Sequence, residues 1–191
     1  MPSNNTGKKV KELWKKYPRR LGMMISPGGW TRSPVPYAID NGRFACTTKN
    51  KPWSEENFKR LCIKAISHTI RPLFITVPDI VGDSQQTLEE WKKWTAPRGW
   101  MRRLNVPLAF VAQDGVNLDD IPTEADWVFI GGSSSWKRQN IYRICRRFKQ
   151  VHVGGINTAR GLWLCHNCGA KSADGTGWVR GDQTQWLGWL R

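Results

Sequence analysis

The chain has 191 residues, and 30 Lys and Arg against 15 Asp and Glu give it a formal net charge of +15. This length suits one domain with a hydrophobic core, and 39% hydrophobic with 24% charged residues is typical of a soluble globular protein. No apolar run is long enough to span a bilayer, and the basic segment 1–16 is unlike a signal peptide. We therefore expect a cytoplasmic protein without a membrane partner.

The excess of positive charge predicts a polyanionic partner. Such a charge repels itself unless it meets a polyanion, and nucleic acid is the commonest one. The chain also has twelve Trp, which can stack on bases, although many will pack in the core. Together these features favour nucleic acid over the alternative that the charge serves solubility alone.

The five Cys are an odd, scattered set, which fits a reducing compartment better than a disulfide framework. Only Cys165 and Cys168 are close in sequence. A single CxxC without a second pair is better interpreted as two helix-end thiols than as a zinc site. We expect no cofactor.

Residues 1–19 are predicted to be a basic arm, helical over 7–16, where Val10, Leu13 and Trp14 share a face. Residues 20–191 are predicted to form one domain, in which short apolar runs alternate with helical patterns. The runs are continuous rather than alternating, as in parallel strands covered on both faces. They are Leu21–Ser26, Tyr37–Ile39, Leu73–Val77, Leu108–Ala112, Trp127–Ile130, Val151–Val153 and the weaker Ala170–Ala173.

The helical patterns fill the gaps between these runs. Ser54 caps a helix predicted over 55–70, and Ser84 opens another. Two more are predicted at Trp136–Phe148 and Thr158–Cys165. Alternating strands and helices indicate an α/β fold with a parallel sheet. About seven strands in this length predict a compact TIM-like β/α barrel with one unit missing or degenerate. The tail, 181–191, carries Trp186 and Trp189. We expect these side chains either to close the barrel or to stack on nucleic acid.

Polar residues collect where the predicted strands end, which is where parallel β/α folds place their active sites. Four of the six strand-end corners carry Asp, and a closed barrel would bring them to one mouth. The corners are Asp40-Asn41-Gly42, Pro78-Asp79 with Gly82-Asp83, Gln113-Asp114-Gly115, Gly131-Gly132-Ser133, Gly154-Gly155-Ile156-Asn157 and Asp174-Gly175-Thr176-Gly177.

Each acid has a structural alternative. Asp83 suits a helix N-cap as well as a ligand, whereas Asp79 lies too far before the helix to cap it. Asp114 before Gly115 is a common turn pair. Gln113 ends an apolar strand with an amide that suits a nucleobase edge. His152 lies inside a predicted strand, where a core histidine is favoured over a catalytic one.

In this order the corners resemble those of the tRNA-guanine transglycosylases and their DNA-modifying relatives, which install 7-deazaguanine bases. Residues 38–44 are similar to the family's Asp-Ser-Gly-Gly-Phe motif, and Asp79 or Asp83 to its base-recognition carboxylate. Residues 111–115 resemble its Gln-Gly-Gly strand end, and 129–132 its Gly-rich base platform.

Two later segments extend the resemblance. Residues 151–154 are similar to a further Gly-Gly turn of the family, and 172–176 to the segment that carries its nucleophilic Asp. The resemblance covers roughly 20–180 and implies a TIM barrel. The chain is shorter than the tRNA enzymes, lacks their Cys-x-Cys-x-x-Cys…His zinc site, and has no appended RNA-binding domain. These departures favour a compact DNA-acting relative, encoded by a phage or a bacterium (and acting in the host cytoplasm if by a phage).

Exchanging a base with retained stereochemistry requires two displacements, so one carboxylate must hold the sugar between them. We expect Asp174 to be this nucleophile and Asp40 to move the proton of the leaving and entering bases. Asp79 and Gln113 would bind a guanine-like base. The remaining expected base-binding residues are Asp83, Gly131, Gly132 and Gly154, the N–H groups of Gly131 and Gly132 facing O6.

Basic runs would neutralise the phosphates of the substrate. We expect contacts from Arg102, Arg103, Lys137 and Arg138, although each alone fits a solvated helix face. The same exchange on tRNA, an N-glycosidase, and a non-catalytic barrel that binds nucleic acid are the alternatives.

Overall fold

The structure is a computed structural model that describes residues 8–18, 20–29 and 35–177. Its centre is a parallel sheet whose seven strands follow one another in sequence order. The strands are β1 (Met23–Ile25), β2 (Tyr37–Ile39), β3 (Ile75–Thr76), β4 (Leu108–Ala112), β5 (Trp127–Ile130), β6 (Val151–Val153) and β7 (Ser172–Ala173). All seven coincide with predicted apolar runs, and the α/β class with a parallel sheet is confirmed.

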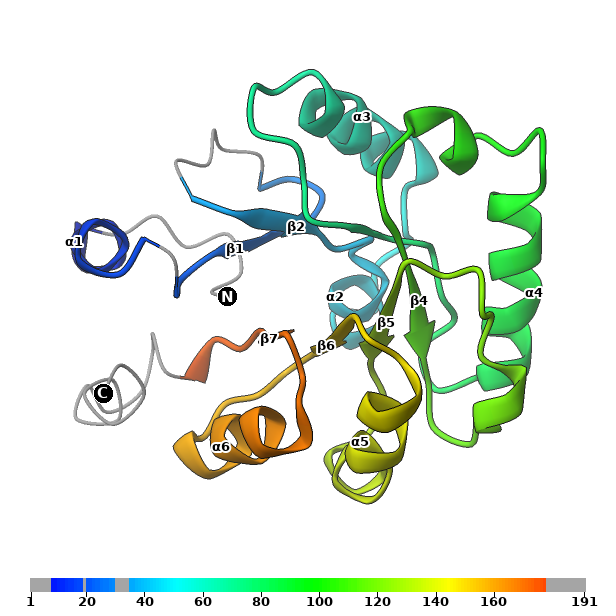
Figure 1. Ribbon diagram of the computed structural model, residues 1–191. Coiled ribbons are helices and arrows are strands. Elements are labelled where there is room, and N and C mark those ends of the chain that lie inside the picture. Colours follow the sequence, from blue (N-terminus) through cyan, green and yellow to red (C-terminus); the bar gives the residue numbers. More distant parts are fainter. Residues whose placement is uncertain (1–7, 19, 30–34, 178–191) are drawn as a thin grey trace.

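The sheet curls into a half-barrel with helices on its outer side (Figure 1). The α-helices are α1 (Lys8–Lys16), α2 (Arg43–Thr48), α3 (Glu55–Ile66), α4 (Ser84–Thr95), α5 (Ser134–Arg147) and α6 (Ala159–Cys168). Two 3-10 turns, η1 (Met101–Leu104) and η2 (Leu118–Asp120), precede β4 and β5. Within the described part of the chain, no pairing joins β7 back to β1.

The two faces of the sheet bury different side chains, because successive residues of a strand point to opposite faces. The outer face packs on the helices in the main core, with β2 contributing Tyr37 and Ile39. The inner face holds a small separate cluster. Its members are Met24, Ala38, Phe74 and Ala109, with Trp127 and Phe129 packed against them. A residue that continues the inner row past a strand end therefore faces the mouth of the half-barrel.

Four of the helices begin at a side-chain N-cap of a residue type that favours this position. Ser54, Ser133 and Thr158 each accept a backbone N–H from the first turn of α3, α5 and α6. Asp83 does the same for α4, where one of its oxygens accepts from the Gln86 N–H at 2.9 Å. The caps of α4, α5 and α6 lie within seven residues of the ends of β3, β5 and β6, at the carboxyl edge of the sheet.

Some elements differ from the sequence-based expectation. The helix α2 was not predicted, since its six residues carry no buried apolar face. The helix α1 was predicted, and it packs Val10 and Trp14 into the main core. None of the helices in the described residues is long and apolar enough to cross a membrane. The expectation for Trp186 and Trp189 falls outside the described residues.

Replacing Asp83 tests its role as a cap. Asp83→Ala removes the acceptor for the Gln86 N–H, so we expect the free energy of unfolding to fall by about 1 kcal/mol. Urea denaturation measures this, with Asp120→Ala on an exposed turn as the control. Equal stability of the two variants would contradict the cap.

Candidate active site

Three carboxylates from three different strands meet at the mouth of the half-barrel. Asp40 follows β2 and Asp174 follows β7, and both continue the inner row of their strands. Asp79 lies three residues beyond β3. Asp40 is close enough to Asp174 and Asp79 for the charge of each to act on it. The sheet therefore brings together acids that are up to 134 positions apart in sequence (174 − 40).

Asp40 is placed to hold a proton near neutral pH. Burial raises its pKa from 3.8 to about 7, and the neighbouring charges of Asp174 and Asp79 add to the rise. Backbone N–H groups of Gly42 and Asn41 act in the opposite direction. A carboxyl group with this pKa can both donate and accept a proton at physiological pH, which is what a general acid–base needs.

Asp79 is nearly buried, with 5% of its surface exposed. Burial raises its pKa, while hydrogen bonds from Asn41 and Gln113 oppose that rise. Asn41 Nδ2 donates to Asp79 Oδ1 at 2.8 Å, and Gln113 Nε2 donates to the other oxygen. Gln113 Oε1 in turn accepts from the Gly82 N–H at 3.2 Å. Two amide side chains thus fix the orientation of this carboxylate.

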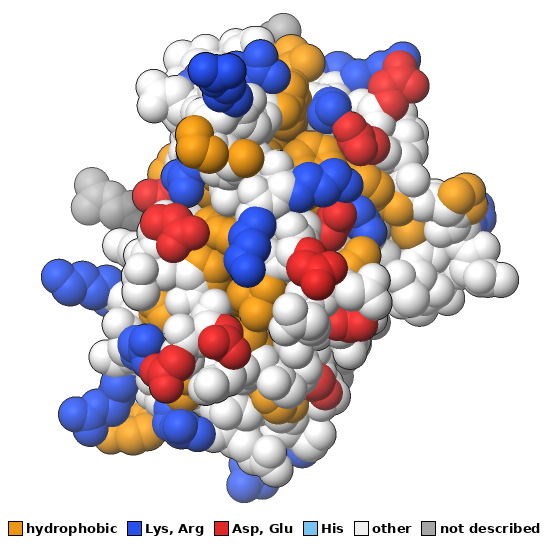
Figure 2. Space-filling model, turned by 90° about the vertical axis from the view of Figure 1, so that its right-hand side faces the viewer, with side chains coloured by type: hydrophobic (Ala, Val, Ile, Leu, Met, Phe, Trp, Pro, Cys, Tyr) orange, Lys and Arg blue, Asp and Glu red, His pale blue; other side chains and the backbone are white. Residues whose placement is uncertain are grey.

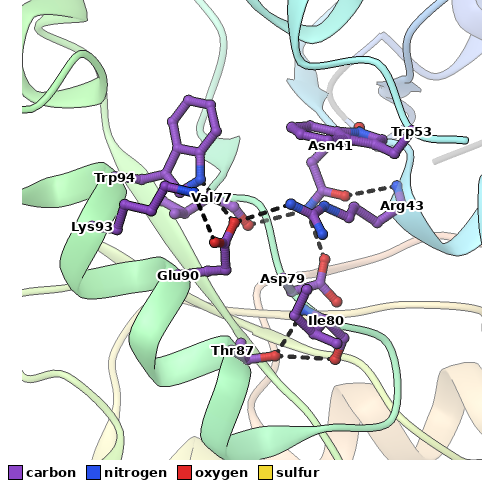
Figure 3. Close-up of polar contacts among 10 residues, drawn as sticks. All are labelled: Asn41, Arg43, Trp53, Val77, Asp79, Ile80, Thr87, Glu90, Lys93 and Trp94. Atoms are coloured by element: carbon purple, nitrogen blue, oxygen red, sulfur yellow. Dashed lines mark hydrogen bonds and ion pairs between the residues drawn. The ribbon is translucent and has the colours of Figure 1, made fainter.

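Arg43 supplies a counter-charge that lowers the pKa of Asp79. Its guanidinium lies 4.2 Å from the centre of the Trp53 ring and forms a 3.0 Å ion pair with Glu90. Trp94 Nε1 also donates to Glu90 at 3.0 Å. Figure 3 shows this cluster beside the Asn41–Asp79 hydrogen bond. It links α2 and α4 at the rim of the site.

Asp174 is held by a buried histidine. His152 Nε2 lies 3.0 Å from Asp174 Oδ1, and His152 Nδ1 lies 2.7 Å from Ser172 Oγ. His152 is fully buried, which lowers its pKa and keeps the ring neutral. A neutral ring has one N–H, which faces the carboxylate, so Nδ1 accepts from the Ser172 hydroxyl. Among the described residues, His152 is therefore the hydrogen-bond partner of Asp174 Oδ1.

The glycines at the mouth allow close packing, and the backbone N–H groups of two of them are already used within the sheet. The N–H groups of Gly131 and Gly154 bind Ala112 O and Ile130 O in the sheet ladder. The expectation that the Gly131 N–H faces a base is therefore wrong. A Cβ on Gly154 would lie 2.5 Å from the Phe129 ring, so glycine is needed for close packing. Gly132 has a φ of 73° and passes within reach of Asp114.

Two further acids of the corners are occupied in loops. Both oxygens of Asp83 bind Gln86, through its backbone N–H and its side-chain amide at 2.7 Å. Of the two alternatives for Asp83, the cap is the one observed. Asp114 Oδ1 accepts from the Ser133 N–H at 2.6 Å and braces the loop before α5. Neither acid belongs to the group of three carboxylates.

The four expected phosphate contacts divide between the two ends of the sheet. Arg102 and Arg103 lie on η1, which precedes β4 and so sits at the amino end, away from the carboxylates. Lys137 and Arg138 lie in the first turns of α5, at the carboxyl end. Lys137 Nζ donates to Gly154 O at 2.7 Å. The face on the side of α4 carries acidic and basic groups interspersed, without a continuous basic patch (Figure 2).

The cysteines of α6 are free thiols, Cys165 buried and Cys168 half-buried. Burial raises the pKa of Cys165 to about 12. Across 8–18, 20–29 and 35–177, no three His, Cys, Asp or Glu side chains gather as a metal site would require.

Sequence reasoning missed the two residues that orient the acids. Asn41 was noted only as part of a corner, and His152 was assigned to the core. The pairing of Phe129, His152 and Ser172 across β5, β6 and β7 places His152 on the inner face. Strand alternation places residues 152 and 154 on the same face of the sheet. This pattern could have indicated that His152 points toward the mouth.

Comparisons with known proteins give no further guide to this site. The chain matches no protein-family model, and no curated protein is significantly similar to it.

The raised pKa of Asp40 predicts a pH-dependent stability. The folded chain holds a proton on Asp40 that the unfolded chain releases near pH 4, so this contribution is complete below pH 4 and is lost as pH rises to about 7. Asp40→Asn removes the loss, and we expect it to be more stable than wild type at pH 8 by on the order of 4 kcal/mol. Thermal unfolding at pH 5 and pH 8 measures the difference. A gap that does not widen with pH would contradict the assignment.

Proposed function

We propose that the protein exchanges guanine in DNA for a 7-deazaguanine base, through a covalent intermediate between Asp174 and the sugar. The fold we propose for it is a compact TIM-like barrel with one degenerate unit. The observation that carries the proposal is the meeting of Asp40 and Asp174 at one mouth, the first with a pKa of about 7 and the second oriented by His152. Two such acids are what a retaining displacement at an anomeric carbon needs.

In the first displacement Asp174 Oδ2 attacks C1′ and forms an ester with the sugar. The bond from C1′ to guanine N9 breaks, and the departing base takes a proton from Asp40. Because the pKa of Asp40 is about 7, this proton is available at neutral pH. The products are neutral guanine, the Asp40 carboxylate and the sugar ester on Asp174.

The second displacement reverses these roles with a new base. The incoming 7-deazaguanine gives its N9 proton to the Asp40 carboxylate and attacks C1′, which releases Asp174. The side-chain exposure of Asp174 is 15%, so it remains accessible to a sugar. No proton or electron is gained or lost over the cycle, and no cofactor is needed.

Asp79 and Gln113 are the proposed recognition pair for the base. Each carboxylate oxygen has two lone pairs, so Asp79 can accept from Asn41 or Gln113 and still bind the N1–H and amine of a guanine. A base without an N1–H and an exocyclic amine would have no donors for the remaining lone pairs of Asp79, which already accepts from Asn41 and Gln113. This arrangement supports selection for guanine-like bases.

A base inside a duplex must be flipped out of the stack before these groups can reach it. DNA is proposed over tRNA because Cys165 and Cys168 do not reproduce the zinc motif of the tRNA enzymes. Both polymers therefore belong in any test.

Base exchange is tested by incubating the protein with a radiolabelled 7-deazaguanine and guanine-containing DNA or tRNA. We expect label to enter DNA. Asp174→Asn should lower incorporation by at least 1000-fold, since the nucleophile is lost, while DNA affinity measured by fluorescence anisotropy stays within about threefold. Asp120→Asn is the matched control and should keep full activity.

Three results would contradict this proposal in different ways. Label in tRNA alone would overturn the choice of polymer. Guanine released without incorporation would indicate an N-glycosidase. DNA binding without chemistry, equal in Asp174→Asn and wild type, would indicate a non-catalytic binding protein.

His152 is proposed to position Asp174, and its replacement should separate rate from binding. His152→Phe keeps an aromatic ring but removes the bond to Asp174 Oδ1, so we expect kcat to fall roughly 10- to 100-fold with little change in KM. His152→Gln offers an amide donor and should recover part of the loss. An unchanged kcat in His152→Phe, or an equal loss in both variants, would contradict this role.

A further inference from the structure

A second recess lies outside the mouth, between α5 and α6 and behind β6. Its volume is about 520 Å³, which exceeds what a single inorganic anion fills. One side of the recess is apolar, and the other is formed by long basic side chains. The apolar lining is Ile141, Val153, Ile156, Leu164 and Cys165, and the basic lining is Lys137, Arg138 and Arg160.

The positive charge of this recess favours the binding of an anion. Three of its lining residues are cationic, and none is acidic. Among the residues described, Arg138 and Arg160 take part in no ion pair, and both are exposed. Arg160 lies in the first turn of α6 and Arg138 at the start of the second turn of α5, near helix N-termini whose dipoles add positive potential. The apolar wall favours an anion that also carries a nonpolar part.

The recess is continuous with the loop that carries Asp174. Asn157, which lines it, accepts through Oδ1 from the N–H groups of Thr176 at 3.0 Å and Gly177 at 2.8 Å. The Ile156 N–H donates to Asp174 O at 2.6 Å. A Cβ on Gly175 would lie 1.9 Å from Ile156 O, so the two loops are in backbone contact. A ligand in the recess would therefore lie against the backbone of the loop that carries Asp174.

We propose that this recess binds a nucleotide of the DNA strand next to the target nucleotide, with its phosphodiester on Arg138 and Arg160 and its sugar and base on the apolar wall. The proposal rests on the proposed function, since it assigns a place to the strand that carries the target base. A free nucleoside monophosphate shares this chemistry, so an experiment must separate the two sources.

The test compares two double variants that remove the same charge from opposite ends of the sheet. Arg138→Gln with Arg160→Gln removes the two exposed charges of the recess, and Lys64→Gln with Arg98→Gln is the matched control at the amino end. Both are made in the full chain carrying Asp174→Asn, so that binding is measured without chemistry. The probe is a fluorescent guanine-containing 12-mer DNA, single- or double-stranded, titrated at several salt concentrations.

We expect the recess pair to weaken DNA binding roughly 30-fold and to reduce the slope of log affinity against log salt by about two. The control pair should change affinity less than threefold. Equal weakening by both pairs would indicate long-range charge alone and would overturn the proposal, as would no change in either. Displacement of the 12-mer by thymidine monophosphate at micromolar concentration would indicate a free-nucleotide site instead.

The outcomes separate this inference from the proposed function. Loss of binding in the recess pair without any base exchange by the wild type would refute the enzyme and keep the recess as a strand-binding site. Base exchange with unchanged binding in the recess pair would refute the recess alone. Thermal unfolding of all variants confirms that each is folded.

Discussion

The gathering of three carboxylates at one mouth is the constraint on which the rest of this site depends. Asp40, Asp79 and Asp174 cannot all remain charged in a partly dry space without compensation. Each meets this constraint in a different way: Asp40 by a pKa near 7, Asp79 by two amide donors, and Asp174 by the N–H of a neutral histidine. The differences among the three environments are what allow the three acids to take different roles.

The fold generates these differences through strand alternation. Parallel strands end at one edge, and their inner rows point to one space, which is why residues as distant as Asp40 and Asp174 are neighbours. The inner row of β5, β6 and β7 aligns Phe129, His152 and Ser172. The histidine ring packs against Phe129 and contacts the Ser172 hydroxyl. The strand register therefore fixes the position from which His152 bonds to Asp174.

Much of the architecture could be predicted from the sequence, because continuous apolar runs and helix caps are local signals. All seven strands and the caps Ser54, Ser133 and Thr158 carry such signals, and the signal is clearest at Ser54, where Glu55 and Glu56 follow in the first turn. The gathering of acids at strand ends could also be anticipated. The recess between α5 and α6 could not, since no local pattern shows which helices leave space between them.

What the sequence did not reveal are interactions that depend on register. The Gly131 N–H was expected to face a base, but it donates to Ala112 of β4. Arg102 was expected to contact a phosphate of the nucleic acid, but η1 lies at the amino end of the sheet. His152 looked like a core residue, and it is buried, yet its ring nitrogen faces Asp174. The outcomes for Gly131 and His152 depend on which residue lies opposite another across the sheet, and single-sequence patterns do not contain that information.

Trapping the covalent intermediate tests the central claim most directly. The protein is incubated with guanine-containing DNA without a new base, denatured in acid, digested, and examined by mass spectrometry. The account predicts that the peptide containing Asp174 carries the mass of a DNA sugar, with free guanine released in equal amount. Released guanine with an unmodified Asp174 peptide, or an adduct on Asp40 instead, would contradict it.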